Sequence, residues 1–312
     1  MKKNLYLLYG DETFLFRHWM RKLRAGDVEY IVYDGKTISE ATLLNLCTTL
    51  PFFASEQLYH ITNIFDNAAI TADNPSLKKA LLSPPDGVTI VFSQDGSPDK
   101  RKKLFKLLSE LCTVQECKPL ASHPLQQWMQ EYAKELEATL SSDAASLLES
   151  SVGSNLWLLS KEIEKLALYA PDKAISEEMV ATLTIASAEA NVFSFIDMLS
   201  EKKTKQALEL LHRLVEDQND VIPLLAMISR QARLLLQALS LQKTVGSRWK
   251  DQMSMHPFVL QKLERQVKNF KEPELLALYK KIYSLDKAMK TSGVNAVGAV
   301  ERLVIEMGMT KP

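Results

Sequence analysis

The stretch Leu5–Leu23, with the sequence LYLLYGDETFLFRHWMRKL, indicates the fold of the first part of the chain. Its first five residues form a short apolar run that is typical of a strand, Gly10 permits a turn, and the residues from Thr13 onward favour a helix. A strand, a glycine turn and a helix in this order are the opening of a nucleotide-binding domain. The stretch therefore predicts the start of such a domain.

The residues that would hold a phosphate in such a domain are missing. A phosphate-binding loop needs a second glycine after the first, followed by Lys and by Ser or Thr, because backbone N–H groups, the Lys and the hydroxyl hold the phosphates and Mg²⁺. Here Leu15, Phe16 and Arg17 stand at those positions. Two bulky apolar side chains would fill the pocket, so we predict the architecture of an ATPase domain without ATP binding or hydrolysis.

A second ATPase element is also missing, namely an acidic pair at the end of the fourth strand that positions Mg²⁺ and water. The apolar strand Val88–Phe92 is followed by Ser93 and Gln94, and Asp95 has no adjacent Glu. The alternative interpretation of both absences is a fold that is not of the ATPase type.

Strand and helix patterns alternate over about the first 120 residues, which predicts a parallel sheet covered on both faces. The expected strands are Leu5–Tyr9, Glu29–Tyr33, Gln57–Thr62, Val88–Ser93 and Thr113–Glu116. The expected helices are Thr13–Leu23, Ser39–Thr48, Pro75–Leu82 and Arg101–Leu111.

Beyond Cys117–Pro119 the strand patterns stop, and helices alone are expected. A small helical domain ends near Ala188, and several long amphipathic helices then predict a bundle. The main signals are Pro124 in a first turn, Ser142 and Asp143 as caps, the apolar stripe of Leu156–Tyr169, a capped turn at Ser176, and helix starts near Asp220, Pro257, Pro273 and Ala296.

The composition is that of an ordinary globular chain. Of 312 residues, 46% are hydrophobic, and 38 Lys and Arg balance 38 Asp and Glu, so any nucleic-acid contact must be local or shared with a partner. Three cysteines argue against a disulfide framework and suit a reducing compartment. No signal peptide or membrane span is predicted, so we expect a cytoplasmic protein without a membrane partner.

The best candidate for a binding site is the segment Leu50, Pro51, Phe52 and Phe53. It joins a helix to the third strand, and Pro51 disfavours helix at Leu50. Adjacent phenylalanines point in different directions, so both cannot easily enter one core. They either cap contacts between the sheet and a helix or form an exposed aromatic wedge for a partner's apolar pocket, where each is worth about 1.5–3 kcal/mol.

The densest basic cluster is Lys100, Arg101, Lys102 and Lys103, which is expected to open a helix. It is either a solvated face or a weak candidate for contact with DNA phosphates. We predict no catalytic, metal or cofactor site, and no cofactor, because the five histidines are scattered and the cysteines lack the spacing of metal ligands.

The order of several local motifs gives this chain its resemblance to a known family, the delta subunit of the bacterial DNA polymerase III clamp loader. The resemblance spans the whole length. It rests on LYGDE at residues 8–12, LPFF at 50–53, DKRKKL at 99–104, EIEKLA at 162–167, NVFSFID at 191–197, RQAR at 230–233 and HPF at 256–258.

The resemblance implies three domains and a non-catalytic role. It implies an AAA+-like α/β domain without ATP sites over residues 1–120, a small helical lid over 121–188, and a C-terminal helical collar for oligomerisation over 189–312. It further implies a wrench that binds and opens the ring-shaped sliding clamp, the beta subunit, so that the clamp can be loaded on primed DNA. In such relatives an apolar pair enters a hydrophobic pocket of the clamp, and Phe52 and Phe53 match that pair.

The implied partners are the sliding clamp, the motor subunits tau or gamma, delta-prime, and primer-template DNA through the complex. Two alternatives remain: a divergent nucleotide-binding enzyme with an unfamiliar phosphate site, and a structural AAA+-like scaffold that only holds neighbouring subunits.

Overall fold

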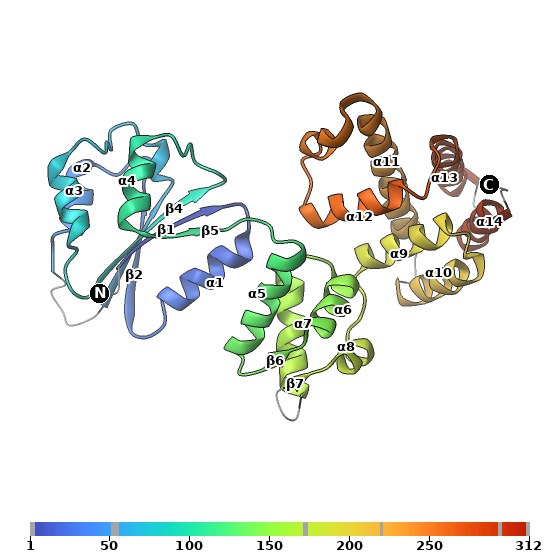
Figure 1. Cartoon of the computed structure of the whole chain (residues 1–312), viewed down its shortest axis with the longest axis horizontal. Coiled ribbons are helices and arrows are strands. Elements are labelled where there is room, and N and C mark those ends of the chain that lie inside the picture. The colour runs from blue at the N-terminus through green and yellow to red at the C-terminus, as the bar shows by residue number, and fades with distance from the viewer. Residues whose placement is uncertain (1–3, 51–55, 171–173, 219–220, 293–294, 310–312) are drawn as a thin grey trace. The chain divides into compact units, whose positions relative to one another are not determined.

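The computed structural model describes residues 4–50, 56–170, 174–218, 221–292 and 295–309. The chain divides into two compact units, residues 1–119 and 120–312 (Figure 1). The first unit is built on a parallel sheet and the second is mainly helical. The expected class, an AAA+-like α/β part followed by helices, is therefore confirmed. The division into three domains at residues 120 and 188 remains a prediction.

The sheet of the first unit has the strand order β2-β3-β4-β1-β5, and every neighbouring pair is parallel. Each strand lies within about two residues of its expected position, because the alternation of strand and helix patterns is strong here. The strands are β1 (Leu5–Gly10), β2 (Val28–Asp34), β3 (Glu56–Thr62), β4 (Val88–Asp95) and β5 (Thr113–Glu116).

Helices cover both faces of this sheet, as burial of a parallel sheet requires. Three of them, α2, α3 and α4, lie on one face over a core that includes Leu43, Leu77 and Leu108, and α1 adds Met20 to a smaller core on the other face around Leu8 (Figure 1). The helices are α1 (Thr13–Leu23), α2 (Glu40–Leu46), α3 (Pro75–Leu82) and α4 (Lys103–Leu111), with a 3₁₀ turn η1 (Ile64–Asp66) after β3.

The central strands fix where a ligand would bind in a fold of this kind. β1 and β4 are buried on both faces, and Leu7, Leu8, Ile90 and Val91 are fully inaccessible, which explains their continuous apolar sequences. The strand order reverses between β1 and β4. In doubly wound sheets ligands bind at such a reversal, outside the carboxyl ends of the strands.

The second unit is a set of packed helices with one short parallel pair, β6 with β7. Its elements are α5 (Ser122–Glu135), β6 (Thr139–Leu140), α6 (Ser142–Val152), α7 (Leu156–Tyr169), β7 (Ala174–Ile175), α8 (Glu177–Leu183), α9 (Ala188–Ser200), α10 (Thr204–Gln218), α11 (Val221–Val245), η2 (Gly246–Gln252), α12 (Pro257–Val267), α13 (Glu272–Ser292) and α14 (Ala296–Met309).

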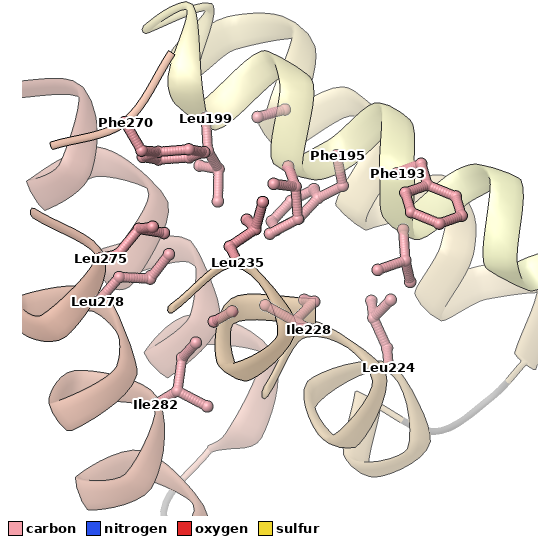
Figure 2. Close-up of a cluster of buried hydrophobic side chains, with 14 of the residues drawn as sticks. Phe193, Phe195, Leu199, Leu224, Ile228, Leu235, Phe270, Leu275, Leu278 and Ile282 are labelled. Carbon is pink, nitrogen blue, oxygen red and sulfur yellow. The ribbon is translucent and has the colours of Figure 1, made fainter. Parts of the chain in front are cut away.

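The largest core of the second unit lies among α9 to α14. Figure 2 shows apolar side chains of α9, α11 and α13 converging in it: Phe193, Phe195, Leu199, Leu224, Ile228, Leu235, Leu275, Leu278 and Ile282. A series of hydrogen bonds between polar side chains crosses this core. Gln231 donates to Gln266 at 2.7 Å, and Gln266 donates to the Asp197 carboxylate at 2.9 Å, so α9, α11 and α12 are also joined by hydrogen bonds.

Three local predictions are wrong. The pair β6–β7 was not expected, because two-residue strands are too short to show periodicity. The α4 helix begins at Lys103 and not at Arg101, because the Asp99 carboxylate accepts from the Arg101 N–H and closes a turn before the helix. The cap of α6 is Ser141, whose hydroxyl accepts from the Ala144 N–H, and not Ser142 or Asp143.

Candidate functional site

The turn after β1, where a phosphate loop would lie, is closed by the chain that follows β5. The Glu12 N–H donates to the Cys117 carbonyl at 2.9 Å, and the Cys117 N–H donates to the Tyr9 carbonyl at 2.6 Å. Gly10 has a φ of +129°, and a Cβ placed on it would lie 2.0 Å from the Cys117 carbonyl oxygen. Glycine is therefore required here for close packing against backbone.

The N-terminus of α1 is capped by a carboxylate of the same turn. The Glu12 side chain accepts from the Phe14 N–H at 3.1 Å. Burial raises the pKa of Glu12, and the hydrogen bond from Phe14 opposes this with a smaller effect. Helix N–H groups at this point are what a phosphate would use in a nucleotide-binding domain, so an anion of the chain itself already lies there.

The two bulky residues that replace the phosphate motif have different environments. Leu15 is buried, with 6% of its surface exposed. Phe16 is partly buried and packs against the core around Leu8 on the α1 face of the sheet. The sequence did not show that Glu12 and Cys117 take up the backbone positions of the turn, because Cys117 lies over 100 residues away in the chain.

At the carboxyl end of β4 the structure places a buried serine next to a histidine. Ser93 Oγ lies 2.8 Å from His60 Nε2, and His60 Nδ1 lies 2.8 Å from the Tyr30 hydroxyl. Burial lowers the pKa of His60 to about 4, and the nearby Asp95 raises it by a smaller amount. This histidine is therefore neutral at physiological pH and serves as a hydrogen-bonding link across β2, β3 and β4.

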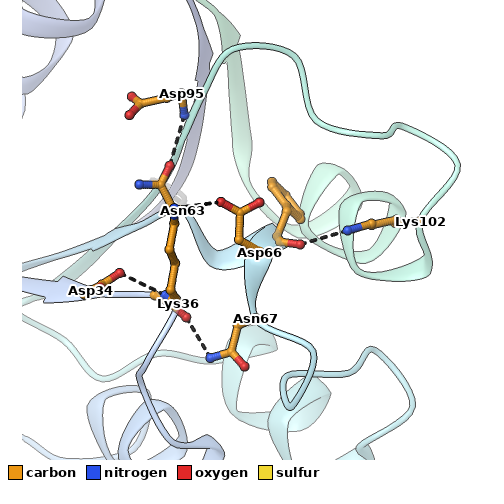
Figure 3. A network of polar contacts seen from close by, with 9 residues as sticks. Asp34, Lys36, Asn63, Asp66, Asn67, Asp95 and Lys102 are labelled. Atoms are coloured by element: carbon orange, nitrogen blue, oxygen red, sulfur yellow. Dashed lines mark hydrogen bonds and ion pairs between the residues drawn. The ribbon is translucent and has the colours of Figure 1, made fainter.

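A polar network ties together the loops at this edge of the sheet (Figure 3). Asn63 has a left-handed backbone with φ of +52°, and its side-chain oxygen accepts from the Asp95 N–H at 3.3 Å. The Asn67 amide donates to the Gly35 carbonyl at 2.7 Å, and Lys36 forms an ion pair with Asp66 at 3.3 Å. The carboxyl ends of β2, β3 and β4 are therefore held together by hydrogen bonds.

Each residue of the basic cluster has a partner inside the first unit. Lys100 pairs with Glu116 at 3.1 Å and lies 5.2 Å from the centre of the Tyr9 ring. Arg101 pairs with Asp99 at 2.9 Å, and this contact lowers the pKa of Asp99 to about 2. Lys102 donates to the Phe65 carbonyl at 2.9 Å, and Lys103 pairs with Asp73 at 3.0 Å. The cluster as a DNA contact remains a prediction.

The candidate binding segment begins in an exposed leucine. Leu50 has 68% of its surface exposed, whereas Pro51, Phe52 and Phe53 lie outside the described residues. Before it, α2 ends in a cap in which the Thr48 hydroxyl donates to the Leu44 carbonyl at 2.9 Å, and the following Thr49 N–H donates to the Asn45 carbonyl.

The strand that follows the segment is also held by hydrogen bonds. The Gln57 N–H donates to the Gly87 carbonyl at 2.8 Å, and the Gln57 side chain donates to the Glu29 carboxylate at 2.8 Å and accepts from the Tyr59 hydroxyl. The described residues on either side of the segment, Thr48 and Gln57, are thus held by hydrogen bonds, and β3 begins here at the amino edge of the sheet. This edge is opposite to the one where a nucleotide would bind.

Metal sites, reactive thiols and membrane spans have little support in the described parts of the chain. There, no set of three His, Cys, Asp or Glu side chains is arranged to hold a metal ion. Cys47, Cys112 and Cys117 are free thiols buried in the protein, and burial raises the pKa of Cys47 and Cys117 to about 12. Over the same residues, no helix combines the length and apolar character needed to span a bilayer.

The fold and the closed turn after β1 define an AAA+-like chain without the ATP motifs. Two family models described as the DNA polymerase III delta subunit match it, one at residues 6–118 and one, for the C-terminal domain, at residues 189–307. A model described as a middle domain matches residues 123–182. The chain belongs to the DNA polymerase III delta subunit family, and the family predicted from the order of its motifs is confirmed.

Individual relatives are similar to this chain over most of its length. It is 27% identical to DNA polymerase III subunit delta of Bacillus subtilis over 308 residues, which cover 92% of this chain and 88% of that protein. It is 26% identical to the same subunit of Escherichia coli over 241 residues, which cover 74% and 69%. The solved Bacillus subtilis DNA clamp loader delta protein is similar in fold, with a TM-score of 0.81 and 23% identity over 98% of this chain and 96% of that one.

Proposed function

We propose that this chain is the clamp-opening subunit of a clamp loader and does not itself bind or hydrolyse ATP. It acts as a wrench that binds the ring-shaped sliding clamp, the beta subunit, and releases one of its interfaces. The motor subunits tau or gamma and delta-prime assemble with it through the helical C-terminal part. Primed DNA passes through the assembled complex, in the cytoplasm.

The observation that carries the clamp-binding role is Leu50, a large apolar side chain that is exposed between a helix end and a strand start that are both held by hydrogen bonds. Family membership supports a clamp-binding role for this segment. We assign Leu50, Pro51, Phe52 and Phe53 to a hydrophobic pocket of the clamp. Each buried Phe is worth about 1.5–3 kcal/mol, so two of them are enough to dominate a small interface.

The lack of ATP chemistry is supported by the turn after β1. The Glu12 carboxylate accepts from the Phe14 N–H at the start of α1, and a phosphate placed there would meet this carboxylate at close range. Like charges at such distances repel strongly where the site is partly buried. The energy for the loading cycle must then come from the motor subunits.

Clamp opening follows from a difference in affinity. A subunit that binds open and closed clamps equally well shifts nothing, and a shift from about 1:99 to 99:1 needs roughly 10⁴-fold tighter binding to the open ring. The apolar wedge must therefore fit the clamp surface better after one interface has been released.

The test is a binding measurement between the full chain and the sliding clamp, with Phe52→Ala combined with Phe53→Ala as the variant. We expect at least a hundredfold loss of affinity, about 3 kcal/mol. Leu168→Ala, which removes an 89% exposed leucine on α7, is the control and should bind as the parent does. Unchanged binding by the double variant would refute the wedge assignment. Saturable ATP binding by the isolated chain would refute the second half of the proposal.

A further inference from the structure

We infer that a pocket between α6 and α12, in the second unit, binds a phosphate group. This site is separate from the clamp-binding segment and does not depend on the proposed function. The pocket has a volume of about 190 Å³ and is lined by side chains of both helices. A water molecule takes up about 30 Å³ in the liquid, so the pocket has room for an anion of the size of phosphate together with a few waters.

Two cations from α12 border this pocket. Lys262 and Arg265 are three residues apart, a spacing that places two side chains on one helix face with their Cβ atoms about 5–6 Å from each other. Neither of them forms an ion pair with another of the described residues. The carboxylate that α12 itself carries, on Glu264, pairs with Lys250 at 2.7 Å. The helix therefore does not neutralise the two positive charges at the pocket.

The neighbours of these cations add further hydrogen-bond donors. The Lys262 ammonium group lies 5.5 Å from the centre of the Phe258 ring, which lines the same pocket. The side-chain oxygen of Gln261 accepts from the Ser122 hydroxyl at 3.1 Å, so the Gln261 amide presents its N–H groups as donors. A phosphate group has more acceptor oxygens than a carboxylate and can accept from an ammonium, a guanidinium and an amide at once. This donor set therefore favours phosphate as the ligand.

The opposite wall of the pocket, from α6, carries one negative charge. Glu149 lines the pocket, and its carboxylate accepts from the Gln126 amide at 3.2 Å rather than pairing with Lys262 or Arg265. Two cations face one carboxylate, so the pocket remains net positive. Glu149 weakens the binding of an external anion, but it is also the group that would pair with the cations if the pocket closed. These two roles predict opposite effects when its charge is removed.

A second carboxylate near the same cations, Asp197 of α9, has a partner of its own. It accepts from the Gln266 amide at 2.9 Å. Burial raises the pKa of Asp197, and the hydrogen bond from Gln266 and the charges of Lys262 and Arg265 lower it by smaller amounts. Asp197 therefore reduces the positive potential of the two cations without replacing the ligand of the pocket.

A phosphate in this pocket would join two parts of the second unit that family models match separately. The α6 helix lies in the part matched at residues 123–182, and α12 lies in the part matched at residues 189–307. The direct contacts between these parts include a hydrogen bond of 3.0 Å between Ser154 Oγ and His256 Nδ1. Hydrogen bonds to an ionised group are about twice as strong as neutral ones, so a bound phosphate would stiffen this joint.

The experiment measures the binding of inorganic phosphate to the full chain by calorimetry in chloride buffer. Lys262→Gln combined with Arg265→Gln should lower the affinity about tenfold or more, because both charges that attract the anion are lost. Glu149→Gln should raise the affinity about threefold, because a like charge is removed. The control, Lys205→Gln combined with Arg213→Gln, removes two exposed cations of α10 and should bind phosphate as the parent does.

A second arm distinguishes the source of the phosphate group. If the pocket takes a free phosphate, the parent binds inorganic phosphate, and a single-stranded DNA oligonucleotide does not compete for it. If the pocket takes the backbone of a nucleic acid, the oligonucleotide displaces inorganic phosphate. In either case the variant without the charges of Lys262 and Arg265 loses the ligand, and hydrogen exchange of the parent slows at residues 146–150 and 261–265 when the ligand is added.

Three results would overturn the phosphate site. The first is binding of neither inorganic phosphate nor the oligonucleotide by the parent. The second is an equal affinity of the parent and of the Lys262→Gln, Arg265→Gln variant. The third is a Glu149→Gln variant that binds phosphate more weakly and melts at a lower temperature than the parent, because Glu149 would then itself be the partner of the two cations. None of these results changes the clamp-binding measurement, so the proposed function is tested separately.

Discussion

The two edges of the sheet differ in their contacts within the chain. At one edge the polar groups are hydrogen-bonded to each other, and at the other large apolar side chains stay exposed. At the carboxyl edge, the Glu12 carboxylate caps α1, Cys117 closes the turn after β1, and Asn63 and Asn67 tie the loops together. At the amino edge, Leu50 and Leu82 are large apolar side chains that remain exposed. The edge at which nucleotide-binding folds usually bind a ligand is closed here by internal contacts, whereas the opposite edge, where we propose that the clamp binds, leaves apolar side chains exposed.

The largest expected effect comes from the turn after β1. Gly10→Ala should reduce the free energy of unfolding by about 3 kcal/mol or more, because the added Cβ would lie 2.0 Å from the Cys117 carbonyl oxygen at a φ of +129°. Gly26→Ala is the matched control, since Gly26 has a φ of +103° and no atom within 4 Å of the added Cβ. Its cost should be about 1 kcal/mol. Urea unfolding of both variants measures the difference, and equal values would mean that Cys117 does not close the turn.

The second effect concerns the buried histidine. Unfolded, His60 takes up its proton near its ordinary pKa of 6.5, and folded only near 4. Stability should therefore fall as pH drops through this interval, by up to about 3 kcal/mol, because the unfolded chain binds more protons there. His60→Gln should show a shallower loss than the parent in urea titrations between pH 7 and 4. His123→Gln, at an exposed position, is the control for the exchange of histidine for glutamine itself. A parent whose stability is flat over this range would show that His60 is not buried neutral.

How far the sequence could predict each edge follows from the range of the interactions. The strands and helices around Gly10 and Leu82 follow local periodicity and turn residues, so their positions were predicted closely. The closure of the turn by Cys117 and the link from His60 to Tyr30 and Ser93 depend on residues that are distant in sequence. Spacing along one chain carries no signal for such contacts, because they depend on the order of strands in the sheet.

The candidate binding segment illustrates the same limit in another way. Local rules placed Leu50 after a helix and before a strand, and the structure agrees, with α2 before it and β3 after it. The partner of such a segment is not encoded in its spacing, and the prediction of a clamp came from resemblance. The basic cluster was singled out for its charge alone, and its ion pairs with Asp73, Asp99 and Glu116 needed the fold to become visible.

A third, smaller effect tests whether hydrogen bonds at the amino edge position the candidate segment for binding. Gln57→Leu removes the side-chain hydrogen bond from β3 to Glu29 of β2, and the one from Tyr59 within β3. It should weaken clamp binding about three- to fivefold, because the segment before β3 loses part of its support. Gln130→Leu, which removes an exposed hydrogen bond to Ser142 in the second unit, is the control. If both variants bind the clamp as the parent does, the link to Glu29 does not position the segment.

The smallest effect is expected at the carboxyl edge, from the basic cluster at the start of α4. Lys103 is 77% exposed and its partner Asp73 is 71% exposed, so water and salt screen their ion pair, which can open for a phosphate at little cost. In an assembled loader, Lys103→Ala should lower affinity for primed DNA about twofold and reduce the slope against salt concentration by about one counterion. Asp73→Ala, which leaves Lys103 without this carboxylate, should act in the opposite direction. Equal DNA affinities and salt slopes for the parent and both variants would mean that Lys103 does not contact DNA. The basic cluster would then be a surface whose charges are paired within the chain, like the other polar groups of the carboxyl edge.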